Sequence, residues 1–116
     1  MRVLQIAPCT FPASRGSAIL IERLAQGLIA RGHRVDTLAP ALRERGRPET
    51  VPTLRAGRLG GGAPLAEPFD ALHSAPQLSR LWYDAALTIS SLRHTPDLLI
   101  GHNLEGGWIA ALAGRA

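Results

Sequence analysis

Two short apolar runs enclose one amphipathic segment in the first forty residues, and this alternation limits the fold more than any other feature. The first run, Arg2–Ala7, stops before Pro8, and the second, HRVDTLAP at 33–40, stops at Pro40. Apolar runs of this length are typical of strands that are buried on both faces of a parallel sheet. A strand, a helix and a second strand in this order predict a βαβ unit.

The segment between the two runs has the pattern of an amphipathic helix. After the loop Cys9–Gly16, Ser17 is a suitable N-cap, and Arg31 followed by Gly32 is a typical C-terminal signal. Apolar positions recur every three or four residues, as they do on one face of a helix. They are Ile21, Leu24, Ala25, Leu28 and Ile29.

The middle of the chain, residues 43–68, has a weaker pattern. RERGRPE at 43–49 is polar, and TVPTLRA at 50–56 is predicted as a short third strand. GRLGGGAPLAEP at 57–68 is predicted as a loop because glycine and proline interrupt regular structure.

Clear periodicity returns in the last third of the chain. Residues 74–96 predict a second long helix, in which Ser74 and Gln77 match a capping box. DLLIGH at 97–102 predicts a fourth strand, and 103–116 predict a third helix that ends without a cap. The apolar stripe expected on the second helix consists of Leu78, Leu81, Trp82, Ala85, Ile89 and Leu92.

This order of elements predicts an α/β fold, a Rossmann-like parallel sheet flanked by helices. Strands in such sheets usually lie in the order 3-2-1-4, so the first and fourth strands are neighbours. Ligands bind outside the carboxyl ends of the strands at that point. We therefore expect the loop 12–17 and the segment that starts at His102 to face one crevice.

Composition fits one globular domain and excludes several other classes. The chain has 116 residues, of which 46% are hydrophobic and 19% are charged. No apolar run approaches the roughly 18 residues of a membrane span, and the N-terminal run is too short for a signal peptide. The single Cys9 excludes an internal disulfide, so we expect a cytoplasmic protein.

The net charge of +4 reflects arginine alone, because the chain has no lysine. The arginines do not form one stripe with interleaved aromatic residues, so nucleic acid is not an expected partner. The basic segment 43–47 is interpreted as a solvated face. The alternative is peripheral contact with an anionic membrane surface or with an acidic acceptor.

The stretch SRGS at 14–17 lies where the first strand's loop meets the first helix. Gly16 allows a ligand to approach the backbone closely, and free N–H groups at a helix start favour an anion. Arg15, Gly16 and Ser17 are therefore candidate substrate-binding residues. The alternative is that Gly16 only makes the turn and Ser17 only caps the helix. The G-x-G-x-x-G and Walker patterns are absent, which argues against classical NAD or ATP binding.

His102 is the candidate catalytic residue, because it follows a buried strand at the expected crevice. A histidine there can hydrogen-bond a ligand hydroxyl or transfer a proton; the alternative is a histidine paired with backbone groups. Asn103 is expected as a helix N-cap and also as a ligand contact. Glu105 is a candidate for orienting His102 or a ligand, and a partner of the helix dipole otherwise.

No metal or cofactor site is predicted. The histidines at 33, 73 and 94 show no metal-ligand spacing with Cys9 or with one another. Cys9 has no paired base in the sequence and is expected to be a buried thiol.

Two stretches of the chain together resemble the N-terminal domain of family-four glycosyltransferases, which have the GT-B fold. Residues 1–40 are similar to that family's opening strand, loop, helix with an RGH end, and second strand. TPDLLIGHNLEG at 95–106 is similar to its fourth strand and the loop that follows. Residues 44–75 carry little of the likeness.

The resemblance implies transfer of a sugar from a nucleotide-sugar donor to an acceptor, with retained anomeric configuration and without a metal ion. It implies that this domain mainly binds the acceptor, and that Gly16 and Ser17 lie close to the donor diphosphate. His102 matches a histidine that contacts the transferred sugar. Many members have a second glycine where this chain has Ser17, and backbone contact would survive that change.

The chain lacks a counterpart of the family's donor domain and of the end of its acceptor domain. We therefore expect a truncated acceptor-side domain, inactive alone and prone to self-association through exposed apolar surface. The rival hypothesis is a non-catalytic Rossmann-like module that binds a partner or a small ligand.

Overall fold

The computed structural model describes residues 1–9, 11–14, 16–44, 46–57, 65–67 and 77–115. The central element is a four-stranded sheet in the order β4-β2-β1-β6. Its strands are β4 (Thr53–Ala56), β2 (Arg34–Pro40), β1 (Arg2–Ile6) and β6 (Leu98–Gly101), and each pairs with its neighbour in parallel. The predicted parallel sheet and the predicted strand order are therefore confirmed.

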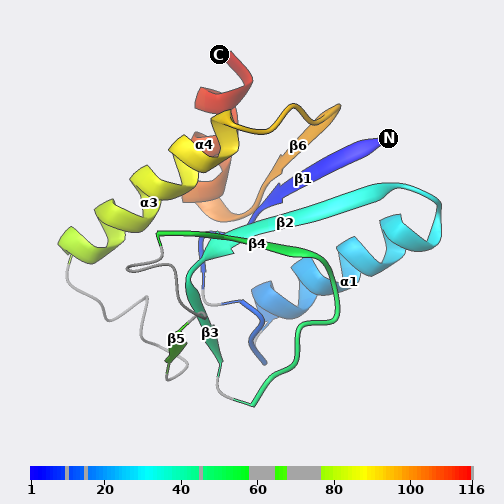
Figure 1. Cartoon of the computed structure of the whole chain (residues 1–116), viewed down its shortest axis with the longest axis horizontal. Helices are drawn as coiled ribbons and strands as arrows, with labels where there is room; N and C mark the ends of the chain where they lie inside the picture. The colour runs from blue at the N-terminus through cyan, green and yellow to red at the C-terminus, as the bar shows by residue number, and fades with distance from the viewer. Residues whose placement is uncertain (10, 15, 45, 58–64, 68–76, 116) are drawn as a thin grey trace.

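Helices cover both faces of the sheet (Figure 1). The helix α1 (Gly16–Ala30) lies on one face, and α3 (Gln77–Leu92) and α4 (Asn103–Arg115) lie on the other. Alternate residues of β1 point to opposite faces: Val3 packs in the core under α1, whereas Leu4 packs in the core shared with α3 and α4. This three-layer arrangement is α/β and Rossmann-like.

The end of α1 forms as its sequence predicts. Gly32 has a φ of 89°, a left-handed conformation that costs glycine little. The amide of Gly32 donates to the carbonyl of Ile29 at 3.0 Å, and the amide of His33 donates to that of Leu28 at 3.1 Å. These two bonds form a Schellman motif, which satisfies carbonyls at the helix end and turns the chain into β2.

The start of α1 differs from its prediction by one residue. The helix begins at Gly16, so Ser17 lies in its first turn and is not the N-cap. On the second helix, Gln77 is the first residue of α3, while Ser74, its partner in the expected capping box, lies outside the described residues.

Two short strands were not predicted from the sequence. The strands β3 (Leu42–Glu44) and β5 (Leu65–Glu67) pair in parallel as a separate two-stranded sheet. The polar segment 43–49 carried no strand prediction, and the loop predicted over 57–68 was wrong at Leu65–Glu67. These strands are only three residues long, too short to show a hydrophobic period.

The apolar stripe expected on α3 was also wrong. Leu87 and Ser91 are the fully buried residues of this helix, whereas Trp82, Ile89 and Leu92 are about half exposed. The side chains of Leu78 and Leu81 lie outside the described residues. The described residues of the predicted stripe therefore do not form the face of α3 that packs in the core, where Leu87 lies instead.

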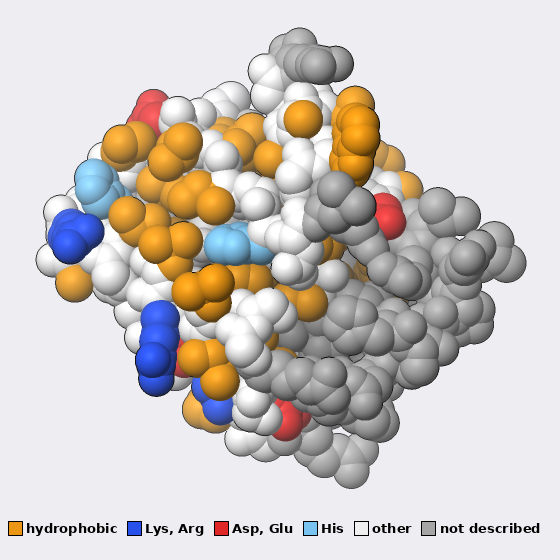
Figure 2. Space-filling model, turned by 180° about the vertical axis from the view of Figure 1, so that it is seen from behind, with side chains coloured by type: hydrophobic (Ala, Val, Ile, Leu, Met, Phe, Trp, Pro, Cys, Tyr) orange, Lys and Arg blue, Asp and Glu red, His pale blue; other side chains and the backbone are white. Residues whose placement is uncertain are grey.

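Hydrophobic side chains also gather on the back of the molecule (Figure 2). Across the described chain, the large hydrophobic residues that are exposed are Met1, Leu20, Leu24, Ile29, Trp82, Ile89, Leu92, Leu98, Trp108 and Leu112.

Candidate functional site

The carboxyl ends of β1 and β6 lie side by side, and the candidate site is built on them. Ile6 and Gly101 are register partners at the ends of these strands. The backbone amide of the next residue, His102, donates to the carbonyl of Ile6 at 3.1 Å. Parallel pairing thus continues for one residue beyond β6 and fixes the backbone from which the imidazole projects.

Two glycines bring α4 against this edge of the sheet. A Cβ added at Gly101 would lie 2.1 Å from the carbonyl oxygen of Gly106, and one added at Gly106 would lie 3.1 Å from the carbonyl oxygen of Ile6. Real Cβ atoms do not approach backbone oxygens as closely as 2.1 Å. Gly101 and Gly106 therefore have a packing role that was not predicted from the sequence.

Asn103 makes the sharp turn between β6 and α4. It is the first residue of α4 and has a φ of 60°, a conformation that asparagine adopts more readily than other residues with a Cβ. A non-helical backbone at this position fits the predicted cap, although its side chain forms no hydrogen bond with the described residues. Glu105 lies in the first turn of α4, and its side chain is outside the described part of the structure.

His102 is half-buried, and one ring nitrogen is already paired. Its Nε2 lies 2.7 Å from Oε1 of Gln5, a fully buried side chain of β1. The side-chain amide nitrogen of Gln5 (its own Nε2) donates to the carbonyl of Ile21 in α1, a longer contact of 3.5 Å. Burial lowers the pKa of His102 from its ordinary value of 6.5, so the imidazole is neutral at pH 7.

The loop that connects β1 to α1 is held against β3 on the other side of the site. The amide of Phe11 donates to the carbonyl of Leu42 at 3.1 Å, and the amide of Glu44 donates to the carbonyl of Pro12 at 3.0 Å. The hydroxyl of Ser14 lies 2.7 and 2.8 Å from the two carboxylate oxygens of Glu44. The loop is thereby fixed just before α1 begins.

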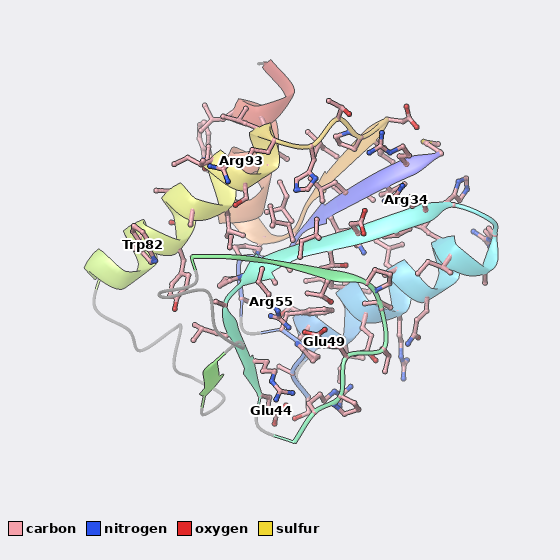
Figure 3. All side chains as sticks on the ribbon, in the orientation of Figure 1. Arg34, Glu44, Glu49, Arg55, Trp82 and Arg93 are labelled. Carbon is pink, nitrogen blue, oxygen red and sulfur yellow. The ribbon has the colours of Figure 1, made fainter. Side chains whose placement is uncertain are left out.

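Arg55 of β4 adds buried contacts that hold the loop between β1 and α1 against β3 (Figure 3). Its side chain is 2% exposed. Its Nη1 donates to the carbonyl of Phe11, and also to those of Pro40 at 3.1 Å and Leu42 at 3.2 Å. Its Nη2 pairs with Glu49. One guanidinium thus ties the loop after β1 to β2 and β3, a role for which arginine's five fixed donors are suited.

Gly16 and Ser17 are both exposed at the start of α1. A Cβ added at Gly16 would meet no described atom within 4 Å, and the φ of Gly16 is not left-handed. Neither packing nor backbone conformation therefore requires glycine here. Arg15, the third candidate in this loop, lies outside the described residues.

The basic segment 43–47 was interpreted as a solvated face, and this interpretation was wrong in part. Glu44 is bonded to Ser14, and Arg47 lies 3.8 Å from Glu22 of α1 in an ion pair. Arg43 is half-buried. These side chains hold the loop and the helix together and are not all free for a lipid surface.

Cys9 is buried, as expected, and burial raises its pKa to about 11. A thiol with that pKa is not a nucleophile at neutral pH. Among the described residues no three His, Cys, Asp or Glu side chains gather in a way that would hold a metal ion. No helix in the described chain is both long and apolar enough to cross a membrane.

Three residues around the site were not among the candidates: Gln5, Glu44 and Arg55. Gln5 had a visible signal, a polar residue in the middle of an apolar strand, which in a buried position needs hydrogen-bond partners. Glu44 and Arg55 had none, because their partners come from segments that only the fold brings together.

Comparison with known proteins gives one family. No match was found among curated proteins or among solved structures. Residues 15–116, which include Gly16, Ser17 and the whole β6–α4 junction, match the glycosyl transferase 4-like domain. The parallel sheet flanked by helices is consistent with this match. The chain thus belongs to the glycosyl transferase 4-like domain family.

Proposed function

We propose that this chain is the acceptor-side domain of a retaining glycosyltransferase with the GT-B architecture, which works together with a donor-binding domain. The enzyme transfers a sugar from a nucleotide-sugar donor to an acceptor without a metal ion. Family membership supports sugar transfer in general. The observation that carries the proposal is the position of His102, a neutral half-buried imidazole at the carboxyl end of β6, beside β1.

In this proposal Gly16 and Ser17 lie close to the donor diphosphate. An exposed glycine at a helix start, with no described packing or conformational need for glycine, leaves the backbone open to a large anion. The N-terminal end of α1 contributes its free N–H groups and the positive end of its dipole. Arg15 is proposed as an additional contact to the same group.

His102 contacts the transferred sugar, and Asn103 and Glu105 provide further substrate contacts from the start of α4. A hydrogen bond to the sugar that strengthens as charge develops would stabilise the transition state more than the bound donor. The imidazole stays neutral under working conditions because burial lowers its pKa. It can therefore accept a proton or a hydrogen bond at neutral pH.

The test replaces His102 in the complete enzyme. We expect His102→Ala to lower turnover by about a hundredfold or more, with a smaller change in donor affinity. His94→Ala is the matched control, because His94 is exposed and lies in the turn after α3. Release of nucleoside diphosphate from a panel of UDP-, GDP- and ADP-sugars measures transfer of the sugar to water, a reaction for which the acceptor need not be known.

Melting temperatures of the same variants separate catalysis from stability. Near-normal turnover per folded molecule in His102→Ala would end the catalytic assignment. Gly16→Leu tests the loop independently: donor binding should weaken while the melting temperature changes little, because a Cβ there meets no described atom. Binding of nucleotide sugars without any turnover would favour a non-catalytic binding module instead.

A further inference from the structure

Gln5 is the one fully buried side-chain amide near the site in the described chain, and the proposed reaction does not use it directly. It is the fourth residue of β1, on the face that packs against α1. A buried amide is costly unless its oxygen and nitrogen are both paired. Here the oxygen faces His102 and the nitrogen faces the carbonyl of Ile21.

The carbonyl of Ile21 determines how the amide is oriented. If the amide were rotated by 180°, its oxygen would face another carbonyl oxygen, and two acceptors would oppose each other. The observed orientation therefore leaves Oε1 of Gln5 toward the ring. Since this oxygen can only accept, Nε2 of His102 must be the nitrogen that carries the proton.

The second ring nitrogen of His102 is then the only one left for a ligand. Nδ1 has no hydrogen-bond partner among the described residues, and it is not one of the buried unpaired atoms. In a neutral ring that is protonated at Nε2, Nδ1 is an acceptor. An acceptor pairs with a hydroxyl group and is repelled by a deprotonated phosphate oxygen.

We propose that Gln5 is a positioning residue that holds His102 as its Nε2–H tautomer, so that Nδ1 takes a hydroxyl donor such as a sugar hydroxyl and not the diphosphate. This proposal deepens the proposed function and rests on it for the identity of the hydroxyl. The tautomer itself depends only on contacts within the chain. In this proposal the two ends of the donor are bound by different groups. His102 selects the sugar, and the start of α1 holds the phosphates.

The experiment measures the tautomer directly by NMR. In the chain labelled with ¹⁵N-histidine, at pH 8 where the ring is neutral, Nε2 should show a pyrrole-type shift and Nδ1 a pyridine-type shift. His102→Ala assigns the signals. Gln5→Met keeps the length of the side chain but removes both hydrogen-bonding groups. We expect the ratio of Nδ1–H to Nε2–H tautomers to rise about fivefold, the factor that corresponds to a net hydrogen bond of about 1 kcal/mol.

Two further variants separate positioning from a general effect on the core. Thr37 is the register partner of Gln5 on β2, is also fully buried, and its hydroxyl has no hydrogen-bond partner among the described residues. Thr37→Val should leave the tautomer ratio unchanged. Gln5→Glu keeps an acceptor opposite Nε2 of His102, so the proton should stay on Nε2. This variant keeps the proposal testable where Gln5→Met does not fold. An unchanged ratio in Gln5→Met, or a proton on Nδ1 in the parent chain, would overturn the proposal.

Turnover in the complete enzyme distinguishes the two proposals. If Gln5→Met lowers kcat and shifts the tautomer while the melting temperature of the domain is kept, Gln5 acts through His102. If the tautomer shifts but His102→Ala retains normal turnover, the positioning contact stands and the proposed function fails. If His102→Ala is inactive and Gln5→Met leaves both the tautomer and kcat unchanged, the positioning role fails and the proposed function stands.

Discussion

Among the described glycines, Gly101 is the one at which an added Cβ would lie nearest to another atom, and this predicts a large effect of a single methyl group. Replacing Gly101 by Ala would put a Cβ 2.1 Å from the carbonyl oxygen of Gly106, 2.4 Å from its carbonyl carbon and 2.7 Å from the amide nitrogen of Gly107. All three atoms belong to the backbone at the start of α4, so no side-chain rotation relieves the contact. The helix and β6 must move apart.

The size of the effect follows from the distance. A carbon and an oxygen ordinarily approach to about 3.3 Å, so the start of α4 must shift by about 1 Å. Overpacking of a close-packed core costs about 1–3 kcal/mol, occasionally more, and a backbone partner places this substitution at the upper end. About 3 kcal/mol corresponds to a fall in melting temperature of roughly 12 °C for a domain of this size.

Gly107→Ala is the matched control, because it adds the same methyl group in the helix that Gly101 faces, at a position where the new Cβ meets no described atom within 4 Å. There alanine should stabilise the chain by about 0.5–1 kcal/mol, since glycine is a poor helix former. Urea unfolding followed by circular dichroism at 222 nm measures both variants, with melting curves as a second readout. A Gly101→Ala chain within about 1 kcal/mol of the parent would refute the close approach of β6 and α4.

Two further predictions concern titratable groups. Cys9, whose pKa burial raises to about 11, should react with a thiol reagent at pH 8 at least about a hundredfold more slowly in the native chain than in urea; equal rates would contradict its burial. Burial lowers the pKa of His102 from 6.5, so the unfolded chain binds this proton more readily than the folded chain. The free energy of unfolding should therefore fall as the pH drops below about 7 toward the lower folded pKa, and it should fall less in His102→Ala; parallel pH profiles of the two chains would argue against the shift.

The sheet order and the C-terminal end of α1 were predictable, because the βαβ pattern and the helix C-cap are signals that can be read in the sequence. Apolar runs at 2–7 and 33–40 around one amphipathic helix predict a βαβ unit, and Gly32 supplies a local C-cap. The order of the remaining strands follows from the general topology of such folds. These features require no knowledge of which distant residues meet.

The buried face of α3 could not be predicted in the same way. Helical periodicity finds an apolar stripe but does not say which face meets the sheet, and the stripe through Trp82 and Ile89 is exposed. Ser91 can be buried instead, because its hydroxyl donates to the carbonyl of Thr88 at 2.7 Å and so needs no solvent. Such local pairing makes a polar residue acceptable in a core and hides it from a hydrophobicity pattern.

For the candidate site, the sequence pointed to His102 but not to its partner. Gln5 and His102 are 97 positions apart, and only the parallel pairing of β1 with β6 makes them neighbours. The same holds for Arg55, whose carbonyl partners lie in two distant segments, the loop after β1 and the junction of β2 with β3.

The Arg55 contacts bear on how this domain can be re-engineered. The loop between β1 and α1 owes its shape to a guanidinium some forty positions later and to Glu44, not to its own few residues. The loop is therefore not expected to keep its conformation when it is moved into another protein by itself. A chimera that transplants residues 8–16 onto another parallel sheet must include β3 and β4, which supply Glu44 and Arg55. A graft of the loop alone would have the same sequence but not the same conformation.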